Sequence, residues 1–174
     1  MTKKLGKLKQ LIPELLFFLL LFVGLQWWQG RDLLTASDSI TAPIFQLPAL
    51  HSDQVISNQT NNKPSIYYFF APWCSVCDLS IENLNAFADE LAAGKINLYI
   101  IALDWQSVEE VAAFVSQHQL PVRVLLGSQT TMNEFQIKGF PTYYVADQDN
   151  KLIWGSIGYS TTLGLKTRLA LTKQ

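Results

Sequence analysis

Two residues of this 174-residue chain are suited to covalent redox chemistry: Cys74 and Cys77, its only cysteines. They lie in the run Ala71-Pro72-Trp73-Cys74-Ser75-Val76-Cys77, between an apolar stretch at 65–70 and a segment with helical spacing at 78–93. The apolar stretch is rich in aromatic residues, which favour strands. The two thiols are therefore expected where a strand passes into a helix.

That position has a chemical consequence. The first turn of a helix presents unpaired N–H groups and the positive end of the helix dipole, and both stabilise a thiolate. Cys74 is expected nearest the exposed turn, with Cys77 one helical turn on and pointing back towards it. Two intervening residues allow a Cys74–Cys77 disulfide. The predicted chemistry is thiol–disulfide exchange, in which Cys74 attacks a substrate sulfur and Cys77 resolves the mixed disulfide.

The same Cys-x-x-Cys spacing occurs in metal knuckles and in pairs of core cysteines. A structural zinc site usually has four protein ligands. Here the only histidines are His51 and His118, and they have no finger-like spacing to the cysteines. A Cys-x-x-Cys pair between a strand and a helix of a βαβ pattern favours redox chemistry. We therefore predict no metal site and no diffusible cofactor.

The N-terminal 41 residues differ in composition from the rest of the chain. Four lysines, at positions 3, 4, 7 and 9, precede an apolar run at 11–28 whose centre, 15–25, carries no charge. That run is just long enough to cross a bilayer core of roughly 30 Å. Trp27 and Trp28 end it, as an interfacial aromatic belt would. We predict a basic cytoplasmic N-terminus (1–10), a transmembrane signal anchor (11–28) and a tether (29–41).

A cleaved signal peptide is the alternative for this segment, but the tryptophan pair and the lack of a convincing Ala-x-Ala site favour an uncleaved anchor. The lysines would keep the N-terminus in the cytoplasm, which places residues 42–174 outside it; in a bacterium this is the periplasmic side of the inner membrane. Disulfides persist there, and a reduced pair needs a dedicated source of electrons. So short a loop removes little entropy from the unfolded chain, so a structural disulfide is poorly motivated.

The soluble part, 42–174, has the pattern of an α/β domain. It carries eight Lys or Arg and eleven Asp or Glu, with no basic patch that would indicate nucleic-acid binding. Strand–helix–strand order predicts a parallel right-handed crossover. An exposed loop is expected at 51–63. Strands are expected at 42–47, 66–70, 96–103, 121–126, 143–146 and 151–157, and helices at 78–93, 107–117, 131–137 and from 161 or 162 onward.

A second motif, Gly139-Phe140-Pro141-Thr142, completes a resemblance to the thioredoxin superfamily. The chain looks most like the membrane-anchored, TlpA-like branch of periplasmic thioredoxins over roughly 43–172. The matching residues are Ala42-Pro43-Ile44-Phe45, Lys63-Pro64, Trp73 to Cys77, Gly139 to Thr142, and a strand–helix insertion at about 97–119. The resemblance implies a thioredoxin fold, with a central mixed sheet flanked by helices. It also implies a cis Pro141 facing the cysteines, with Trp73, Phe140 and Thr142 supporting substrate binding.

Two positions depart from that family. Many thioredoxins have a buried acid six residues before the first cysteine, which accepts the proton of the resolving thiol; here that residue is Tyr68, expected to pack the strand. Asp78 and Glu82 are near in sequence but are expected on a helix surface, so Cys77 has no assigned proton acceptor. Ser75 and Val76 also replace the Gly-Pro pair of cytoplasmic thioredoxin.

The resemblance implies a reductase of protein disulfides, of the type that serves cytochrome c maturation or metal-centre assembly. Its substrates would be protein thiols and disulfides, and a membrane redox partner would recharge it. Two alternatives stay open: a disulfide-forming oxidase or isomerase, and a non-catalytic thiol carrier of a soft ion such as Cu(I). A monomer is expected.

Overall fold

The computed structural model describes residues 13, 16–18, 20–21, 34, 40–59 and 62–172. The chain divides into two units, Met1–Asp32 and Leu33–Gln174. The predicted basic N-terminus, anchor and tether fall largely outside the described residues. Within the described part of the chain, no helix has both the length and the apolar character needed to cross a membrane.

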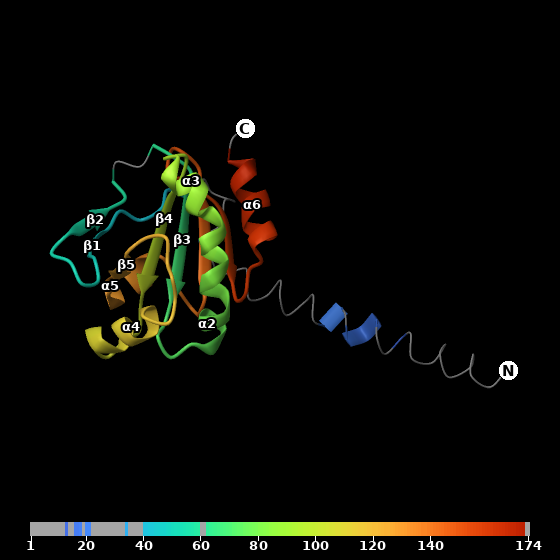
Figure 1. Ribbon diagram of the computed structural model, residues 1–174. Coiled ribbons are helices and arrows are strands. Elements are labelled where there is room, and N and C mark those ends of the chain that lie inside the picture. Colours follow the sequence, from blue (N-terminus) through green and yellow to red (C-terminus); the bar gives the residue numbers. More distant parts are fainter. Residues whose placement is uncertain are drawn as a thin grey trace. The chain divides into compact units, whose positions relative to one another are not determined.

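The second unit is built on a five-stranded mixed sheet in the order β5-β4-β3-β6-β7 (Figure 1). β3 pairs parallel with β4 and antiparallel with β6, so it lies at the centre and all six of its residues are buried. The crossover from β3 to β4 is parallel, as predicted. The strands are β3 (Ser65–Phe70), β4 (Asn97–Ala102), β5 (Val124–Leu126), β6 (Thr142–Ala146) and β7 (Leu152–Ile157).

The helices largely match the expected segments, with one clear difference. The predicted helix at 78–93 begins earlier and is interrupted by a 3₁₀ segment with two asparagines, of which Asn83 donates to the carbonyl of Ser160 (3.1 Å). The side chain of Asn83 thus ties this segment to the chain just before α6 (Thr162–Leu171). Gly94, at φ +64°, follows the last helical turn. The elements are α2 (Ser75–Ile81), η2 (Glu82–Phe87), α3 (Ala88–Ala92), α4 (Val108–Val115), α5 (Gln129–Glu134) and α6 (Thr162–Leu171).

The segment before β3 corrects the sequence prediction. A two-stranded antiparallel sheet joins β1 (Gln46–Pro48) to β2 (Val55–Ser57), and β2 lies inside the region predicted to be a loop. β1 is also shorter and later than the predicted strand at 42–47. The turn between the strands contains His51 at φ 56°. Because β2 has only three residues in a polar segment, its alternation was too short to stand out.

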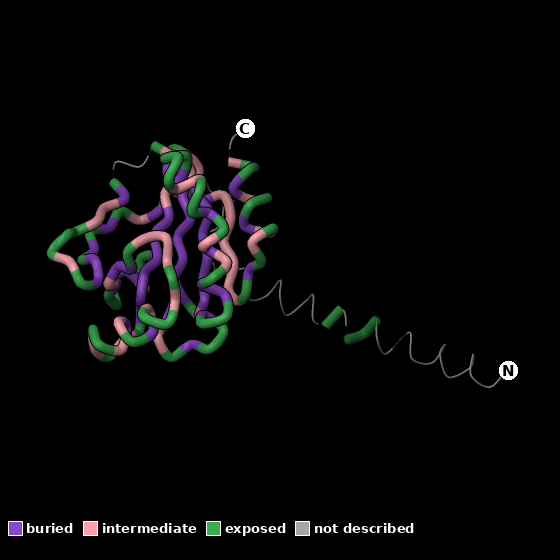
Figure 2. The backbone as a smooth tube through the Cα atoms, in the orientation of Figure 1, coloured by how far each residue is buried: buried purple, intermediate pink, exposed green. Residues whose placement is uncertain are grey.

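Alternate residues of β3 face two separate apolar layers. Ile66, Tyr68 and Phe70 pack with residues of α2, η2, α4 and α6. Tyr67 and Phe69 pack on the other face with Phe45, Phe135 and the start of the domain. In Figure 2 the strands β3, β4 and β6 are almost wholly buried between these layers. The central strand is therefore held from both sides, which fixes the loop that follows it.

Candidate functional site

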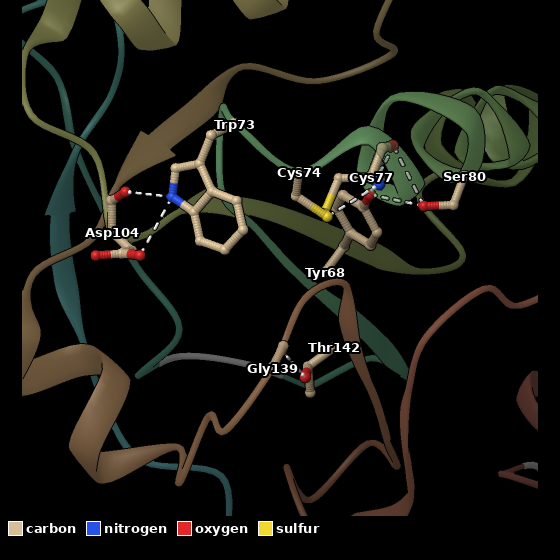
Figure 3. Close-up of a disulfide and its surroundings, with 8 residues drawn as sticks. All are labelled: Tyr68, Trp73, Cys74, Cys77, Ser80, Asp104, Gly139 and Thr142. Atoms are coloured by element: carbon tan, nitrogen blue, oxygen red, sulfur yellow. Dashed lines mark hydrogen bonds between the residues drawn. A yellow bond between two sulfur atoms is a disulfide. The ribbon is translucent and has the colours of Figure 1, made fainter.

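Cys74 and Cys77 form a disulfide at the junction of β3 and α2 (Figure 3). Cys74 is the N-cap residue of α2, and its Sγ accepts a hydrogen bond from the backbone N–H of Cys77 at 3.2 Å. A capping acceptor satisfies one of the unpaired N–H groups of the first turn, a place usually taken by Ser, Thr, Asp or Asn. The sulfur thus occupies the position where a helix best stabilises negative charge.

The two cysteine residues differ in exposure. Cys74 keeps 7% of its surface exposed, whereas Cys77 is 0% exposed. Cys74 is therefore the more accessible of the two to a partner molecule.

Trp73 is exposed, at 61%. Its indole Nε1 donates to the backbone oxygen (3.1 Å) and the Oδ2 (3.2 Å) of Asp104, and its ring meets Phe140 edge to face at 5.8 Å. Asp104 was not predicted. The sequence did carry a signal that Asp104 would lie near Trp73. Asp104 follows β4 closely, Trp73 follows β3, and the carboxyl ends of neighbouring parallel strands lie at the same edge of the sheet.

The second predicted motif lies beside the first. The Phe140–Pro141 peptide bond is cis, as the resemblance implies. Phe140 is half-buried, whereas Pro141 and Thr142 are buried. The Thr142 hydroxyl donates to the carbonyl of Gly139 at 2.7 Å, so its polar group closes the loop. The contact between Trp73 and Phe140 joins the two motifs.

Tyr68 lies behind Cys77 at the position where many thioredoxins have an acid. Its hydroxyl donates to the carbonyl of Cys77 (3.1 Å) and lies 2.9 Å from the hydroxyl of Ser80 (Figure 3). Burial, with a smaller contribution from Tyr143, raises the pKa of Tyr68 well above its usual value. The ring packs the strand as predicted, but the polar role of its hydroxyl was missed. The side chain stays neutral at any physiological pH.

The two nearby acids, Asp78 and Glu82, are exposed, as predicted. They face His118, at 3.0 Å and 3.4 Å, and the side chain of His118 is 5% exposed. These contacts tie α2 and η2 to the turn after α4. Among the described residues no Asp or Glu is buried, and no three metal-ligating side chains are grouped to hold an ion.

Comparison with known proteins places this site in a family. The family model of AhpC/TSA matches residues 40–154. A protein of Oryza sativa subsp. japonica, Probable nucleoredoxin 3, is 30% identical over 129 residues. The match covers 70% of this chain and 24% of that protein, so the chain spans only about a quarter of this relative's length.

Two solved structures share the fold. A thiol:disulfide interchange protein of the thioredoxin family from Chlorobium tepidum TLS superposes with a TM-score of 0.69 at 19% identity, covering 79% of this chain and 99% of its own. The pneumococcal exposed lipoprotein thioredoxin Etrx1 from Streptococcus pneumoniae superposes with a TM-score of 0.65 at 18% identity. The match covers 74% of this chain and 99% of that protein's chain. The chain belongs to the AhpC/TSA family and has a thioredoxin-like α/β fold. Family and disulfide together support a thiol–disulfide oxidoreductase.

Proposed function

We propose that this member of the AhpC/TSA family reduces protein disulfides outside the cytoplasm through the Cys74–Cys77 pair. The observation that carries the proposal is a disulfide at the start of a helix with one reachable sulfur. The Cys74 thiolate attacks a partner disulfide, which releases one partner thiol. Cys77, losing its proton, then attacks Cys74, which releases the second. Two electrons and two protons pass to the partner, and the Cys74–Cys77 disulfide forms.

The two roles follow from the capping geometry. In the oxidised protein the Sγ of Cys74 is a neutral acceptor of the Cys77 N–H. In the reduced protein a thiolate there accepts a charge-assisted hydrogen bond, which is stronger. Since Cys77 has no exposed surface, it resolves mixed disulfides rather than starting exchange.

Partner proteins would be held by the apolar surface around Cys74. Trp73 and Val76 are both exposed, and Phe140 adjoins Trp73. An extended partner segment would run along the backbone of Phe140, with Pro141 covering the sulfurs and Thr142 holding the loop. This arrangement brings a partner sulfur to Cys74.

The finer assignment to a TlpA-like, membrane-anchored periplasmic protein rests on the N-terminal sequence. The lysines, the apolar run at 11–28 and the tryptophan pair support an anchor. Some proteins of similar fold are described as a thiol:disulfide interchange protein and as an exposed lipoprotein. A membrane dithiol protein would then return electrons to the pair, and no diffusible cofactor takes part.

Trapping tests the activity. In cells producing Cys77→Ser, Cys74 should accumulate in mixed disulfides with partner proteins that dissolve on reduction. The Cys74→Ser variant keeps a capping oxygen and should trap none. If neither variant captures a protein, or if both capture the same set, the assigned roles are wrong.

The reduction potential of the pair tests the direction. A reductase should have a potential near that of thioredoxin, about −270 mV, whereas a disulfide-forming oxidase lies nearer −120 mV. A strongly oxidising value would exclude the reductase and favour the alternative.

A further inference from the structure

Three fully buried hydroxyl groups lie together behind the redox disulfide. They belong to Tyr68 of β3, Ser80 of α2 and Tyr143 of β6, each 0% exposed. The rings of Tyr68 and Tyr143 are 4.8 Å apart. The hydroxyls of Tyr68 and Ser80 converge on one atom, whereas that of Tyr143 lies near Ser80 and the backbone of Ser160 without a well-formed hydrogen bond.

That atom is the carbonyl oxygen of Cys77. The hydroxyl of Tyr68 lies 3.1 Å from it, that of Ser80 3.3 Å from it, and the two hydroxyls are 2.9 Å apart. The three oxygen atoms, of the Tyr68 hydroxyl, the Ser80 hydroxyl and the Cys77 carbonyl, are thus all within hydrogen-bond distance of one another, and two hydrogens are shared among them. Either Tyr68 donates to the carbonyl and accepts from Ser80, or the order is reversed. In both cases the carbonyl of Cys77 is held by a neutral, fully buried donor.

We propose that Tyr68, together with Ser80, is a positioning residue for the resolving step of the exchange reaction. The inference rests on the proposed function and adds to it how Cys77 is aimed at Cys74. When a partner opens the Cys74–Cys77 bond, Cys77 loses its covalent restraint. The hydroxyl pair keeps its backbone in place, so its sulfur stays within reach of Cys74. A carboxylate at the same place would add a buried charge.

The position also determines how the proton leaves. Tyr68 is fully buried and stays protonated, and among the described residues every Asp and Glu side chain is at least partly exposed. Cys77 therefore gives its proton to water or to the departing partner thiol as its bond to Cys74 forms and the Cys74–partner bond breaks. The pH dependence of resolution should then report one ionisation, that of the Cys77 thiol, without a second from a buried acid.

Ellman's reagent, an aromatic disulfide whose halves absorb light when released, separates the two steps. With equimolar reagent the reduced full-length protein should release one half as Cys74 attacks and the second as Cys77 resolves. Tyr68→Phe should slow the second release about fivefold relative to the first, the effect of one ordinary hydrogen bond. Tyr143→Phe, which loses a neighbouring hydroxyl that does not bind the carbonyl of Cys77, is the matched control and should leave the ratio unchanged.

The variants are compared at one concentration of protein and reagent, because the first release is bimolecular and the second is intramolecular. Circular dichroism checks that each variant is folded, because unfolded chains also react with the reagent. Ser80→Ala should also slow the second release relative to the first. The variant that combines Tyr68→Phe with Ser80→Ala should be little slower than the slower single variant, because both hydroxyls hold the same carbonyl of Cys77. The wild type and Tyr68→Phe should share one pH midpoint. The proposal would be overturned if Tyr68→Phe left the ratio of the second to the first release rate unchanged. It would also be overturned if the wild type showed a second ionisation in the pH profile of resolution that Tyr68→Phe lacked. Absence of the first release in the wild type would instead refute the proposed function.

Discussion

Tyr67 and Tyr68 are adjacent, fully buried residues of one strand, and they serve opposite faces of the sheet. The hydroxyl of Tyr67 donates to Asn150 and accepts from Asn58, which in turn binds the chain at Pro43 and Phe45. On this structural face, polar contacts tie distant segments of the domain together.

On the redox face, within the described part of the chain, the hydroxyl of Tyr68 makes its hydrogen bonds to Ser80 and Cys77. Both partners belong to α2, the helix that carries the disulfide. The position of a buried tyrosine along the strand thus decides whether its hydroxyl contacts distant segments of the domain or the helix that carries the disulfide. Loss of the polar contacts of Tyr67 should therefore change stability, and loss of those of Tyr68 should change exchange.

The largest effect on stability is expected from Asn58→Ala. It removes the acceptor for the N–H of Phe45 and the donor to the carbonyl of Pro43, and leaves the hydroxyl of Tyr67 with one contact fewer. Buried groups left unpaired should lower the free energy of unfolding by about 2–4 kcal/mol. Urea denaturation measures this loss. Asn58→Asp keeps the acceptor but buries a carboxylate beside the carbonyl of Pro43, so it should lose at least as much stability. Exchange rates should stay those of the wild type in both variants, and a slower exchange in either would contradict the comparison.

Alkaline pH should weaken both faces. Burial raises the pKa of Tyr143, on the redox face, and of Tyr144, on the structural face, to about 12. The unfolded chain releases these protons near pH 10. The contribution of these two protonated tyrosines to the free energy of unfolding is complete below about pH 10. It is lost as the pH rises through about 12, because in that interval the unfolded state has released protons that the folded state still keeps.

The free energy of unfolding should therefore fall by up to about 3 kcal/mol per ring across that interval. Denaturation at a series of pH values, with tyrosinate absorbance as a second signal, measures it. Tyr143→Phe and Tyr144→Phe should each remove their own share of the decline. A stability that stays level to pH 12 would contradict the burial of both rings.

A smaller effect is expected from Asp104→Ala, which affects function without touching the sulfurs. It removes the carboxylate that receives the indole N–H of Trp73, while the backbone acceptor of the same residue remains. Trp73 should become more mobile beside Phe140, and kcat/KM for a protein disulfide should fall about threefold, mostly through KM. Asp104→Asn, which keeps an acceptor oxygen, is the control. Equal losses in both variants would show that the charge matters and the tether does not.

The smallest effect should come from His118→Gln, which breaks the contacts to Asp78 and Glu82. Both carboxylates are exposed, and such pairs contribute roughly 0–1 kcal/mol. The loss in the free energy of unfolding should shrink further at high salt. A loss above about 2 kcal/mol would mean that packing of the imidazole on Phe114, at the end of α4, contributes more than the contacts to the two carboxylates.

Much of this arrangement could be predicted from the sequence, because strong local patterns produced it. The continuous apolar run before the cysteines predicted the central buried strand, and Ser107 and the threonines near 161 predicted two helix starts that the structure has. The resemblance to the thioredoxin superfamily, carried by the Cys-x-x-Cys and Gly-Phe-Pro-Thr motifs, implied which two loops would meet. β2 was missed because three residues carry too little alternation.

The site residues that sequence reasoning missed act through tertiary contacts. Asp104 meets Trp73 from 31 residues away and His118 meets Asp78 from 40 residues away, distances over which periodicity gives no signal. Tyr68 was noticed only as a missing acid. Its two hydrogen bonds depend on the packing of α2 against β3, which a strand pattern does not reveal.

The most direct test of the account is alkylation of the reduced full-length protein across a range of pH, with each cysteine followed separately by mass spectrometry. Cys74 should react rapidly already below pH 7, while Cys77 stays protected. If the two cysteines instead react alike, with the profile of an ordinary thiol near pH 8.5, then the start of α2 activates neither sulfur and the proposed exchange chemistry fails.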